Sequence, residues 1–122
     1  MKRFEAKVIV GSGRGRRLGF PTANLDKINL DIDYGVYSVE VEVDNKPYKG
    51  LLHFGQRKTF NEGVSSELYI KDFNQNIYHQ NVKVKIIKKI REIKKFKNVE
   101  ELKKQISKDI ESITESRKAG RR

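Results

Sequence analysis

The sequence of 122 residues contains no cysteine and no tryptophan, and only two histidines and two prolines. The absence of cysteine excludes disulfide bonds, thiolate metal sites and thiol nucleophiles. His53 and His79 are too few to form a histidine-rich metal site. The sequence also lacks an apolar run of about 18 residues, which a bilayer-spanning helix needs, and it has no signal-peptide pattern at its start. We therefore expect a cytoplasmic protein with no membrane partner.

Hydrophobic residues are scarce at 36%, whereas charged residues reach 35% and give a formal net charge of +11. This length suits one hydrophobic core, so residues 1–122 are expected to form a single domain. We place its core at about residues 5–116 and expect the basic tail, residues 117–122, to fray because it has no apolar face. The excess of positive charge favours a phosphate-bearing or other polyanionic partner, without deciding which.

Alternating apolar and polar residues predict a fold made mainly of β-strands. The clearest alternation is in residues 36–43, which a tight turn at 44–46 joins to a second strand at 47–54. Further strands are predicted at 5–10, at 66–73 and over 82–91. In the last of these, Val82, Val84, Ile86 and Ile90 are expected on one face, and Lys83, Lys85, Lys89 and Arg91 on the other. Residues 26–35 and 55–63 are interpreted as loops. Five or six such strands indicate a small antiparallel barrel or sandwich.

The period of the apolar residues changes near the C-terminus. Val99, Leu102, Ile106, Ile110 and Ile113 form a stripe with helical spacing. Asn98 is a suitable N-cap, and Glu101 completes a capping-box pattern three residues later. The sequence therefore predicts an amphipathic helix that packs across the sheet.

The stretch GSGRGRRLGFPTANL, residues 11–25, is the strongest candidate for a binding loop. Its glycines allow close approach of the backbone to a ligand, its arginines supply positive charge, and Pro21 is followed by two side chains with oxygen atoms, Thr22 and Asn24. Backbone donors, cations and hard oxygen ligands together suit a polyphosphate with its metal ion. A flexible basic loop that touches nucleic acid is the alternative. The common P-loop, dinucleotide-binding and protein-kinase motifs are absent from the sequence.

Two further residues could take part in chemistry. Glu67 is a carboxylate on a predicted strand whose other face is apolar, and His53 ends an apolar strand run. From the residues alone, a solvated strand carboxylate and a structural histidine are the simpler interpretations.

Several segments together resemble the riboflavin kinase (flavokinase) family, the module that forms the C-terminal half of bacterial bifunctional FAD synthetases. Residues 11–25 resemble its nucleotide loop with the PTAN signature, and YGVY at 34–37 resembles the start of its next strand. GQRKTF at 55–60, ELYIKDF at 67–73 and IREIKKF at 90–96 are similar to its G-x-R-P-T-F, E-x-H-x-x-D-F and I-R-x-E-x-x-F segments. Order and spacing agree over nearly the whole chain.

The resemblance implies a closed antiparallel barrel of Greek-key type with about six strands and a C-terminal amphipathic helix packed on it. It implies transfer of the γ-phosphate of ATP to the 5′-hydroxyl of riboflavin, with FMN and ADP as products. Mg²⁺ is the implied cofactor, with Zn²⁺ or Mn²⁺ as alternatives, and the chain is expected to act as a monomer. Glu67 matches the catalytic carboxylate, and Thr22 and Asn24 match positions that bind metal and phosphates. The remaining implied nucleotide contacts are Gly11, Gly13, Gly15, Arg16, Arg17 and Pro21, and the implied flavin contacts are Arg57, Thr59, Arg91 and Phe96.

The chain departs from the family pattern at Lys58, where proline is usual, at Tyr69, where histidine is usual, and at Ile93, where glutamate is usual. Because it begins close to its first strand, we interpret it either as a stand-alone kinase or as a piece of a longer protein, and claim no FAD synthesis. The rival function is a small basic RNA-binding barrel. The lack of aromatic residues in the basic strand 82–91 disfavours that rival, and also nucleic acid as a partner. A third alternative is a kinase-like barrel that binds flavin or nucleotide without turnover.

Overall fold

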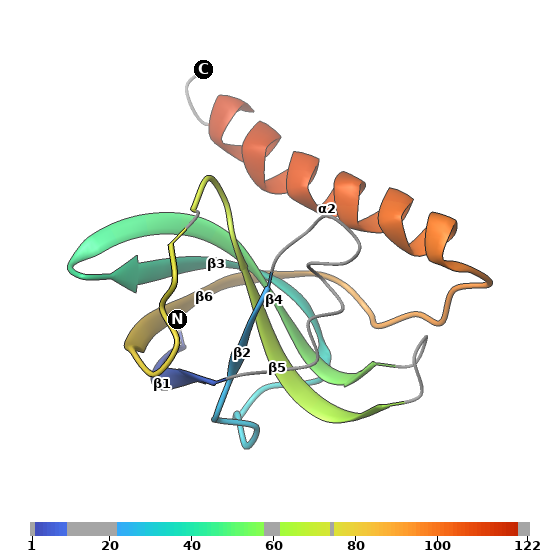
Figure 1. Cartoon of the computed structure of the whole chain (residues 1–122). Helices are drawn as coiled ribbons and strands as arrows, with labels where there is room; N and C mark the ends of the chain where they lie inside the picture. The colour runs from blue at the N-terminus through green and yellow to red at the C-terminus, as the bar shows by residue number, and fades with distance from the viewer. Residues whose placement is uncertain (1, 10–21, 58–61, 74, 120–122) are drawn as a thin grey trace.

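The strands of the chain close into an antiparallel barrel (Figure 1). The structure is a computed structural model that describes residues 2–9, 22–57, 62–73 and 75–119. Its strands are β1 (Arg3–Ile9), β2 (Ala23–Leu25), β3 (Gly35–Val43), β4 (Lys46–Arg57), β5 (Glu62–Ile70) and β6 (Asn81–Arg91). They are ordered β1-β2-β5-β4-β3-β6, and β6 pairs back onto β1. Because β3, β4 and β5 are successive neighbours and β6 returns beside β3, the order is that of a Greek key. The predicted fold class is confirmed.

The hairpin of β3 and β4 follows directly from the sequence. Val43 pairs with Lys46, and the two residues between them, Asp44 and Asn45, have φ angles of 51° and 66°. Two residues with positive φ make a type I′ turn, whose twist matches that of the flanking strands, and Asp and Asn tolerate this conformation. The predicted tight turn is confirmed.

Alternate residues of each strand fill the barrel. The interior is made of apolar side chains, of which Val8, Leu25, Val41, Leu52, Leu68, Val82 and Val84 are among the most deeply buried. Tyr37 also points inward, and its hydroxyl donates a hydrogen bond to the carbonyl oxygen of Asp33 at 2.7 Å. Burial raises the pKa of Tyr37 above its ordinary value, so this hydroxyl keeps its proton at neutral pH.

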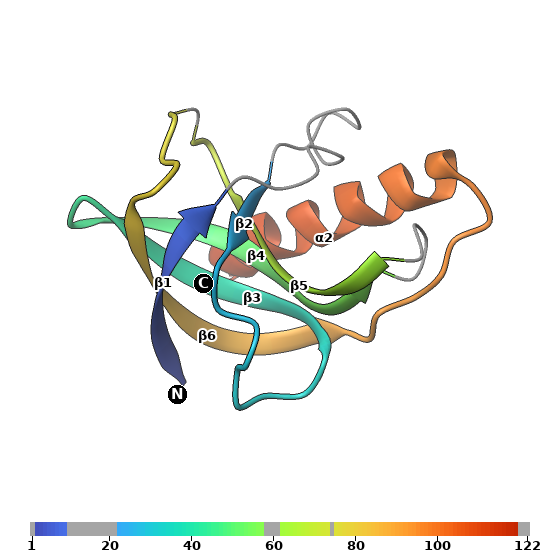
Figure 2. The same cartoon turned by 60° about the horizontal axis from the view of Figure 1, so that its bottom comes forward.

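The helix α2 (Val99–Ala119) packs on the outside of the barrel (Figures 1 and 2). Asn98 caps it, because its Oδ1 accepts a hydrogen bond from the backbone N–H of Glu101 at 3.0 Å. The helix buries Ile113 and part of Ile110 against an outer apolar cluster of Val36, Leu51, Tyr69 and Ile90. The predicted N-cap and the packed helix are confirmed. The helix extends to Ala119, so it includes residues 117–119 of the predicted tail, whereas 120–122 lie outside the described residues.

Ile90 was predicted on the wrong face of its strand. It packs in the outer cluster under α2, whereas Val82, Val84 and Ile86 lie inside the barrel. The pairing of β3 with β6 shifts register twice, between Val36 and Tyr37 and between Ser38 and Val39. Each shift inserts an unpaired residue, so a strict period of two does not hold along the strand.

The extent of the strands also differs from the prediction. β2 was not predicted, because three residues are too few to display alternation. Residues 55–57 and 62–63 were predicted as loop but belong to the paired ends of β4 and β5. β5 ends at Ile70 rather than at residue 73, since Asp72 has a φ of 58° and turns the chain. Within the described residues, no helix is long and apolar enough to cross a membrane.

Replacement of Gly50 with alanine is expected to lower the free energy of unfolding by about 1–3 kcal/mol, the usual effect of overpacking a core. Gly50 is buried, and a Cβ atom there would overlap the backbone carbonyl oxygen of Tyr69 on the paired strand β5. Gly63→Ala is the matched control, because a Cβ on Gly63 meets no atom within 4 Å. Urea unfolding measures both. Equal stability of the two variants would contradict the tight packing at Gly50.

Candidate active site

The short strand β2 brings two residues of the binding loop to the predicted catalytic carboxylate. In the pairing of β2 with β5, Asn24 lies directly opposite Glu67 and Ala23 lies opposite Leu68. The hydroxyl of Thr22, the residue before β2, donates a hydrogen bond to Oε1 of Glu67 at 3.2 Å. Residues 45 positions apart in the sequence thus meet at one place, and three of the predicted site residues lie together.

These side chains lie on the outer side of the sheet. Leu25 and Leu68 point into the barrel, so their neighbours Asn24 and Glu67 point outward. Glu67 nevertheless has only 7% of its surface exposed. A buried carboxylate is costly unless hydrogen bonds satisfy it, and the Thr22 hydroxyl supplies one.

The backbone next to Glu67 is held in place through Ser66. Ser66 is 1% exposed, and its hydroxyl donates a hydrogen bond to the carbonyl oxygen of Lys27 at 2.6 Å. This contact ties β5 to the loop that follows β2. Lys7 and Asp26 tie that same loop to β1 through two further hydrogen bonds, each of 2.9 Å. These hydrogen bonds fix the backbone that carries Glu67, and a positioned catalytic group requires such a rigid backbone.

The rest of the predicted nucleotide loop cannot be placed beside Glu67. Gly11, Gly13, Gly15, Arg16, Arg17 and Pro21 lie outside the described residues, as do Thr59 and Lys58. Arg57 is the last residue of β4, opposite Glu62 of β5.

Arg91, another of the predicted flavin contacts, lies away from Glu67. The residues Glu67, His53, Val36 and Arg91 are successive cross-strand neighbours on β5, β4, β3 and β6. Three strand spacings put Arg91 about 14 Å from Glu67 along the sheet. The guanidinium carbon of Arg91 lies 6.0 Å from the centre of the Phe96 ring, so these two predicted contacts do meet each other.

Arg91 is bound to a partner that sequence reasoning missed. Its Nε lies 3.0 and 3.1 Å from the two carboxylate oxygens of Asp109 on α2, and its Nη2 lies 2.8 Å from Oδ2. Nη1 donates to the carbonyl oxygen of Glu92 at 3.1 Å, and Gln105 donates to Asp109 at 3.0 Å. Asp109 falls on the buried stripe of the helix, three residues after Ile106 and four before Ile113. A charged residue on this apolar stripe could have indicated a buried ion pair from the sequence.

The structure describes what packs around two of the residues that depart from the family pattern, Tyr69 and Ile93. Tyr69 packs in the outer cluster under α2, where burial raises the pKa of its hydroxyl. Ile93 lies against Gly55, whose φ of 137° suits glycine, and a Cβ there would contact both Ile93 and Tyr34. Both departures therefore replace a polar side chain with one that packs on the barrel.

The donor atoms at the site fit a hard divalent cation. Thr22 and Asn24 carry hydroxyl and amide oxygens, and Glu67 adds a carboxylate. Oxygen donors are those that Mg²⁺ prefers, and it commonly takes few protein ligands and completes its shell with phosphates and water. Among the described residues, no group of three or more His, Cys, Asp and Glu side chains could hold a metal.

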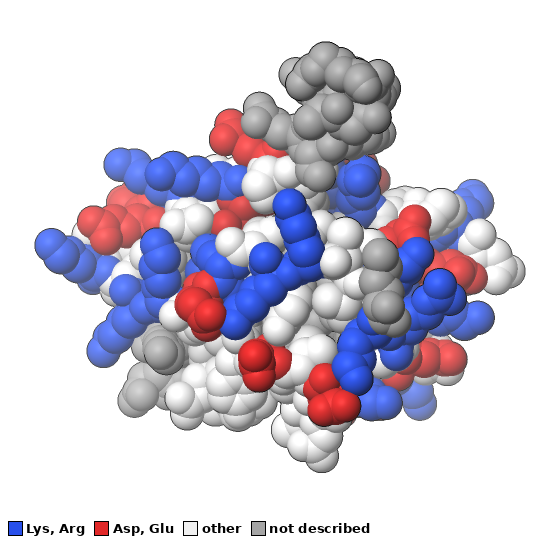
Figure 3. Space-filling model, turned by 180° about the vertical axis from the view of Figure 1, so that it is seen from behind, with Lys and Arg blue, Asp and Glu red and all other residues white. Residues whose placement is uncertain are grey.

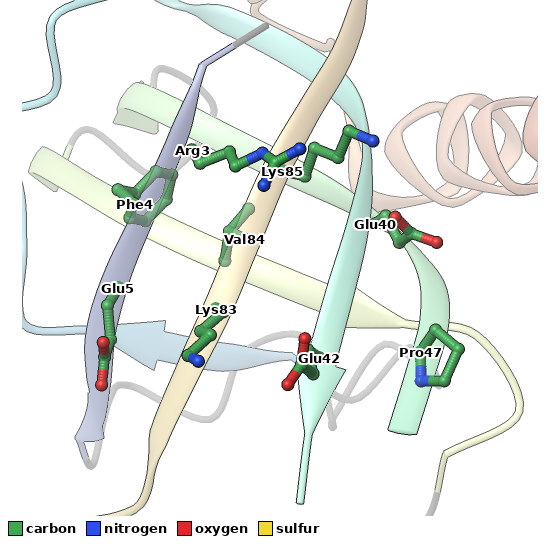
Figure 4. A pocket seen from close by; sticks show the side chains of 9 residues that line it. All are labelled: Arg3, Phe4, Glu5, Glu40, Glu42, Pro47, Lys83, Val84 and Lys85. Carbon is green, nitrogen blue, oxygen red and sulfur yellow. The ribbon is translucent and has the colours of Figure 1, made fainter. Parts of the chain in front are cut away.

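A surface depression of about 370 Å³ lies over β1, β6 and β3 and is lined by charges of both signs (Figure 4). Arg3, Lys85 and Glu40 form one cross-strand row, and Glu5, Lys83 and Glu42 form the next. Lys and Arg are abundant on the face of the molecule in Figure 3, with acidic side chains among them. Because each row of the depression includes an acidic residue, it does not present the continuous positive track that a nucleic-acid backbone needs. Acidic and basic side chains on neighbouring strands thus form a solvated face of mixed charge.

Comparison with known proteins gives a consistent family assignment. The family model for riboflavin kinase (Flavokinase) matches residues 2–117. The bifunctional riboflavin kinase/FMN adenylyltransferase of Bacillus subtilis (strain 168) is 42% identical over 108 residues, which are 84% of this chain and 34% of that protein. The chain thus spans about a third of the length of this curated relative.

Two solved structures share the fold. A protein of Streptococcus pneumoniae described as a macrolide-efflux protein has a TM-score of 0.82 and 36% identity, over 92% of this chain and 38% of the other. The riboflavin kinase of Trypanosoma brucei has a TM-score of 0.59 and 23% identity, over 95% of this chain and 80% of the other. The barrel with its C-terminal helix is therefore a known architecture.

Proposed function

Because this chain belongs to the riboflavin kinase family, we propose that it transfers the γ-phosphate of ATP to the 5′-hydroxyl of the ribityl chain of riboflavin, giving FMN and ADP. The observation that carries the proposal is the meeting of Thr22, Asn24 and Glu67 on β2 and β5. Phosphoryl transfer depends mainly on positioning and on neutralising the charge of the phosphate oxygens, and these three side chains suit both tasks.

Glu67 acts on the nucleophile. An alcohol is a poor nucleophile at neutral pH, and a carboxylate within hydrogen-bond reach orients it and accepts its proton during the transfer. The burial of Glu67 supports this role, because a carboxylate shielded from water interacts more strongly with the bound hydroxyl. The hydrogen bond from Thr22 keeps Glu67 in one orientation.

Thr22 and Asn24 act on the phosphates. Their side-chain oxygens would hold Mg²⁺, or in its place Zn²⁺ or Mn²⁺, next to the carboxylate. When bound, the cation neutralises charge on the phosphate oxygens. On the basis of the sequence alone, we also propose that the glycines and arginines of residues 11–17 contact the nucleotide.

Among the residues predicted to contact the flavin, we propose that Arg91 has a structural role. Its donor groups are directed to Asp109 and Glu92, so it fixes the segment that carries Phe96. Phe96, Arg57 and Thr59 remain the proposed flavin contacts, and we propose that the chain acts as a monomer.

The direct test is incubation of the purified chain with riboflavin and MgATP, followed by chromatography of the flavins. We expect FMN to form in an amount equal to the ADP produced. Absence of FMN, with binding of riboflavin or ATP retained, would point to a barrel that binds without turnover. Absence of FMN together with salt-sensitive RNA binding would favour the RNA-binding alternative.

Replacement of Thr22 with valine is expected to raise KM for MgATP and lower kcat, with a combined loss in kcat/KM of about 10–100-fold. Valine keeps the shape of threonine but removes the hydroxyl that donates to Glu67 and would face the cation. Thr22→Ser keeps the hydroxyl and serves as the control, with activity near that of the parent chain. Steady-state kinetics at varied MgATP checks this. If Thr22→Val and Thr22→Ser behave alike, the hydroxyl has no part in the site.

A further inference from the structure

A groove of about 510 Å³ lies between α2 and the strands β3 and β6. Small-molecule sites are commonly hollows of about 300–1,000 Å³, so the size of this groove suits a small ligand. Its charged lining consists of five cationic side chains, Lys88, Lys89, Arg91, Lys94 and Lys108, and one carboxylate, that of Asp109. In contrast to the mixed-charge depression over β1, this groove therefore has a strong excess of positive charge.

A chain of polar contacts orders one side of the groove. Asp109 accepts hydrogen bonds from Arg91 at 2.8 Å and from the side-chain amide of Gln105 at 3.0 Å. The oxygen of that same amide lies 3.4 Å from Nζ of Lys94, which donates to it. These contacts connect β6, the segment 92–98 and α2. Because the side chains already hold one another, a ligand that binds beside them loses less free energy to ordering them.

Three of the cations in the groove are not neutralised by a carboxylate. Lys89 forms an ion pair with Glu92 at 2.8 Å. Over the part of the chain that the structure describes, no acidic side chain forms an ion pair with Lys88, Lys94 or Lys108. These three lysines belong to β6, to the segment 92–98 and to α2, respectively. Positive charge from three separate elements thus meets at one groove.

We propose that this groove binds a small anion with two phosphate groups, of the pyrophosphate class. Ammonium groups bind phosphate through charge-assisted hydrogen bonds, which are stronger than neutral ones. A single phosphate group carries a charge of only about −1.5 to −2 at neutral pH, so two groups match three cations more closely. Ser38, directly opposite Lys88 on β3, adds a hydroxyl to the lining. Such a ligand would tie β6 to α2.

This groove is separate from the candidate active site. Glu67 lies on β5, and β4 stands between β5 and the strand β3 that borders the groove. The outer apolar cluster under α2, which includes Leu51 of β4 and Tyr69 of β5, also lies on that side of the sheet. The proposal therefore does not depend on the kinase function, and either one can fail without the other.

Calorimetric titration of pyrophosphate into the whole chain, at low ionic strength and without Mg²⁺, tests the proposal. We expect Lys88→Gln and Lys108→Gln each to weaken binding about tenfold, since each removes a hydrogen bond from a charged donor. Both lysines are exposed, so neither replacement leaves a cavity in the core. Lys46→Gln is the matched control, because Lys46 is exposed at the start of β4, does not line the groove, and changes the net charge equally. Its affinity should equal that of the parent chain.

Two further measurements locate the ligand. Amide NMR resonances of residues 88–94 and 105–112 should shift on titration with pyrophosphate, because these segments form the walls of the groove. Thr22→Val should bind pyrophosphate as the parent chain does, since Thr22 lies beside Glu67. Inorganic phosphate should bind more weakly than pyrophosphate. Equal affinity for the two anions would overturn the assignment of two phosphate groups.

The remaining outcomes are equally specific. Absence of pyrophosphate binding overturns the proposal, and so does equal weakening in all three lysine variants, which would reflect only the net charge of +11. Binding that is lost in Thr22→Val but kept in Lys88→Gln and Lys108→Gln would assign the anion to the candidate active site instead. FMN formation by Lys88→Gln and Lys108→Gln should match that of the parent chain. A parent chain that makes no FMN but binds pyrophosphate through these lysines overturns the kinase function and supports the groove.

Discussion

Replacement of Glu67 with glutamine is expected to lower kcat for FMN formation by about 10²–10⁴-fold, the usual contribution of a general base. Glutamine has nearly the same shape and keeps an oxygen that can accept the hydrogen bond from Thr22, so the pairing of β2 with β5 is preserved. What is removed is the capacity to take a proton from the substrate hydroxyl. KM for riboflavin and MgATP should therefore change little. Single-turnover measurements with saturating MgATP would isolate the chemical step.

Glu40→Gln is a suitable control for this experiment. Glu40 is exposed on the outer face of β3, in the mixed-charge row with Arg3 and Lys85 (Figure 4), and its replacement changes the net charge by the same amount. We expect it to have the activity of the parent chain. Near-normal turnover in Glu67→Gln would remove Glu67 from the mechanism, whereas equal losses in both variants would indicate a general effect of charge.

Removal of the Asp109 carboxylate is the change with the largest expected effect on stability. Asp109→Ala should lower the free energy of unfolding by about 3–5 kcal/mol, since it leaves an unpaired charge in a buried position. The side chains of Arg91 and Asp109 are only 15% and 6% exposed, so water cannot replace the lost partner. Denaturant unfolding followed by circular dichroism measures the change.

Two further variants make this test specific. Glu111→Ala removes an exposed carboxylate from the same helix and should shift stability by no more than about 0.5 kcal/mol. A double variant, Arg91→Met with Asp109→Leu, should recover most of the loss, because an apolar pair needs no charge compensation. An Asp109→Ala variant as stable as Glu111→Ala would show that the ion pair does not hold α2 to the barrel.

The sequence allowed the larger elements to be predicted because their patterns are local. The alternation in residues 36–43 and the turn at Asp44 and Asn45 specify the central hairpin without reference to any other part of the chain. Asn98 and the apolar stripe likewise specify α2. The choice of a closed barrel came from the resemblance to the kinase family, since alternation alone left a sandwich open.

The features that could not be predicted depend on contacts between distant segments. Strand β2 exists only because β1 and β5 lie on either side of it. The position of Ile90 under α2 results from register shifts against β3, which alternation within one strand does not reveal. The pairing of His53 with Glu67 across β4 and β5 likewise depends on strand register. From the sequence, Glu67 could be chosen only by resemblance, and His53 could not be connected to it.

The short strand β2 has a consequence for the order in which the proposed site assembles during folding. The consecutive strands β3, β4 and β5 pair through short connections, whereas Asn24 must find Glu67 across 43 positions of the chain. Closing a long loop costs more entropy than closing a short one, and such contacts tend to form late. During refolding, the central meander would therefore exist before Thr22 and Asn24 arrive. On this path the site is completed only when the barrel closes. A partly folded chain would therefore have Glu67 in place on β5 without Thr22 and Asn24 beside it.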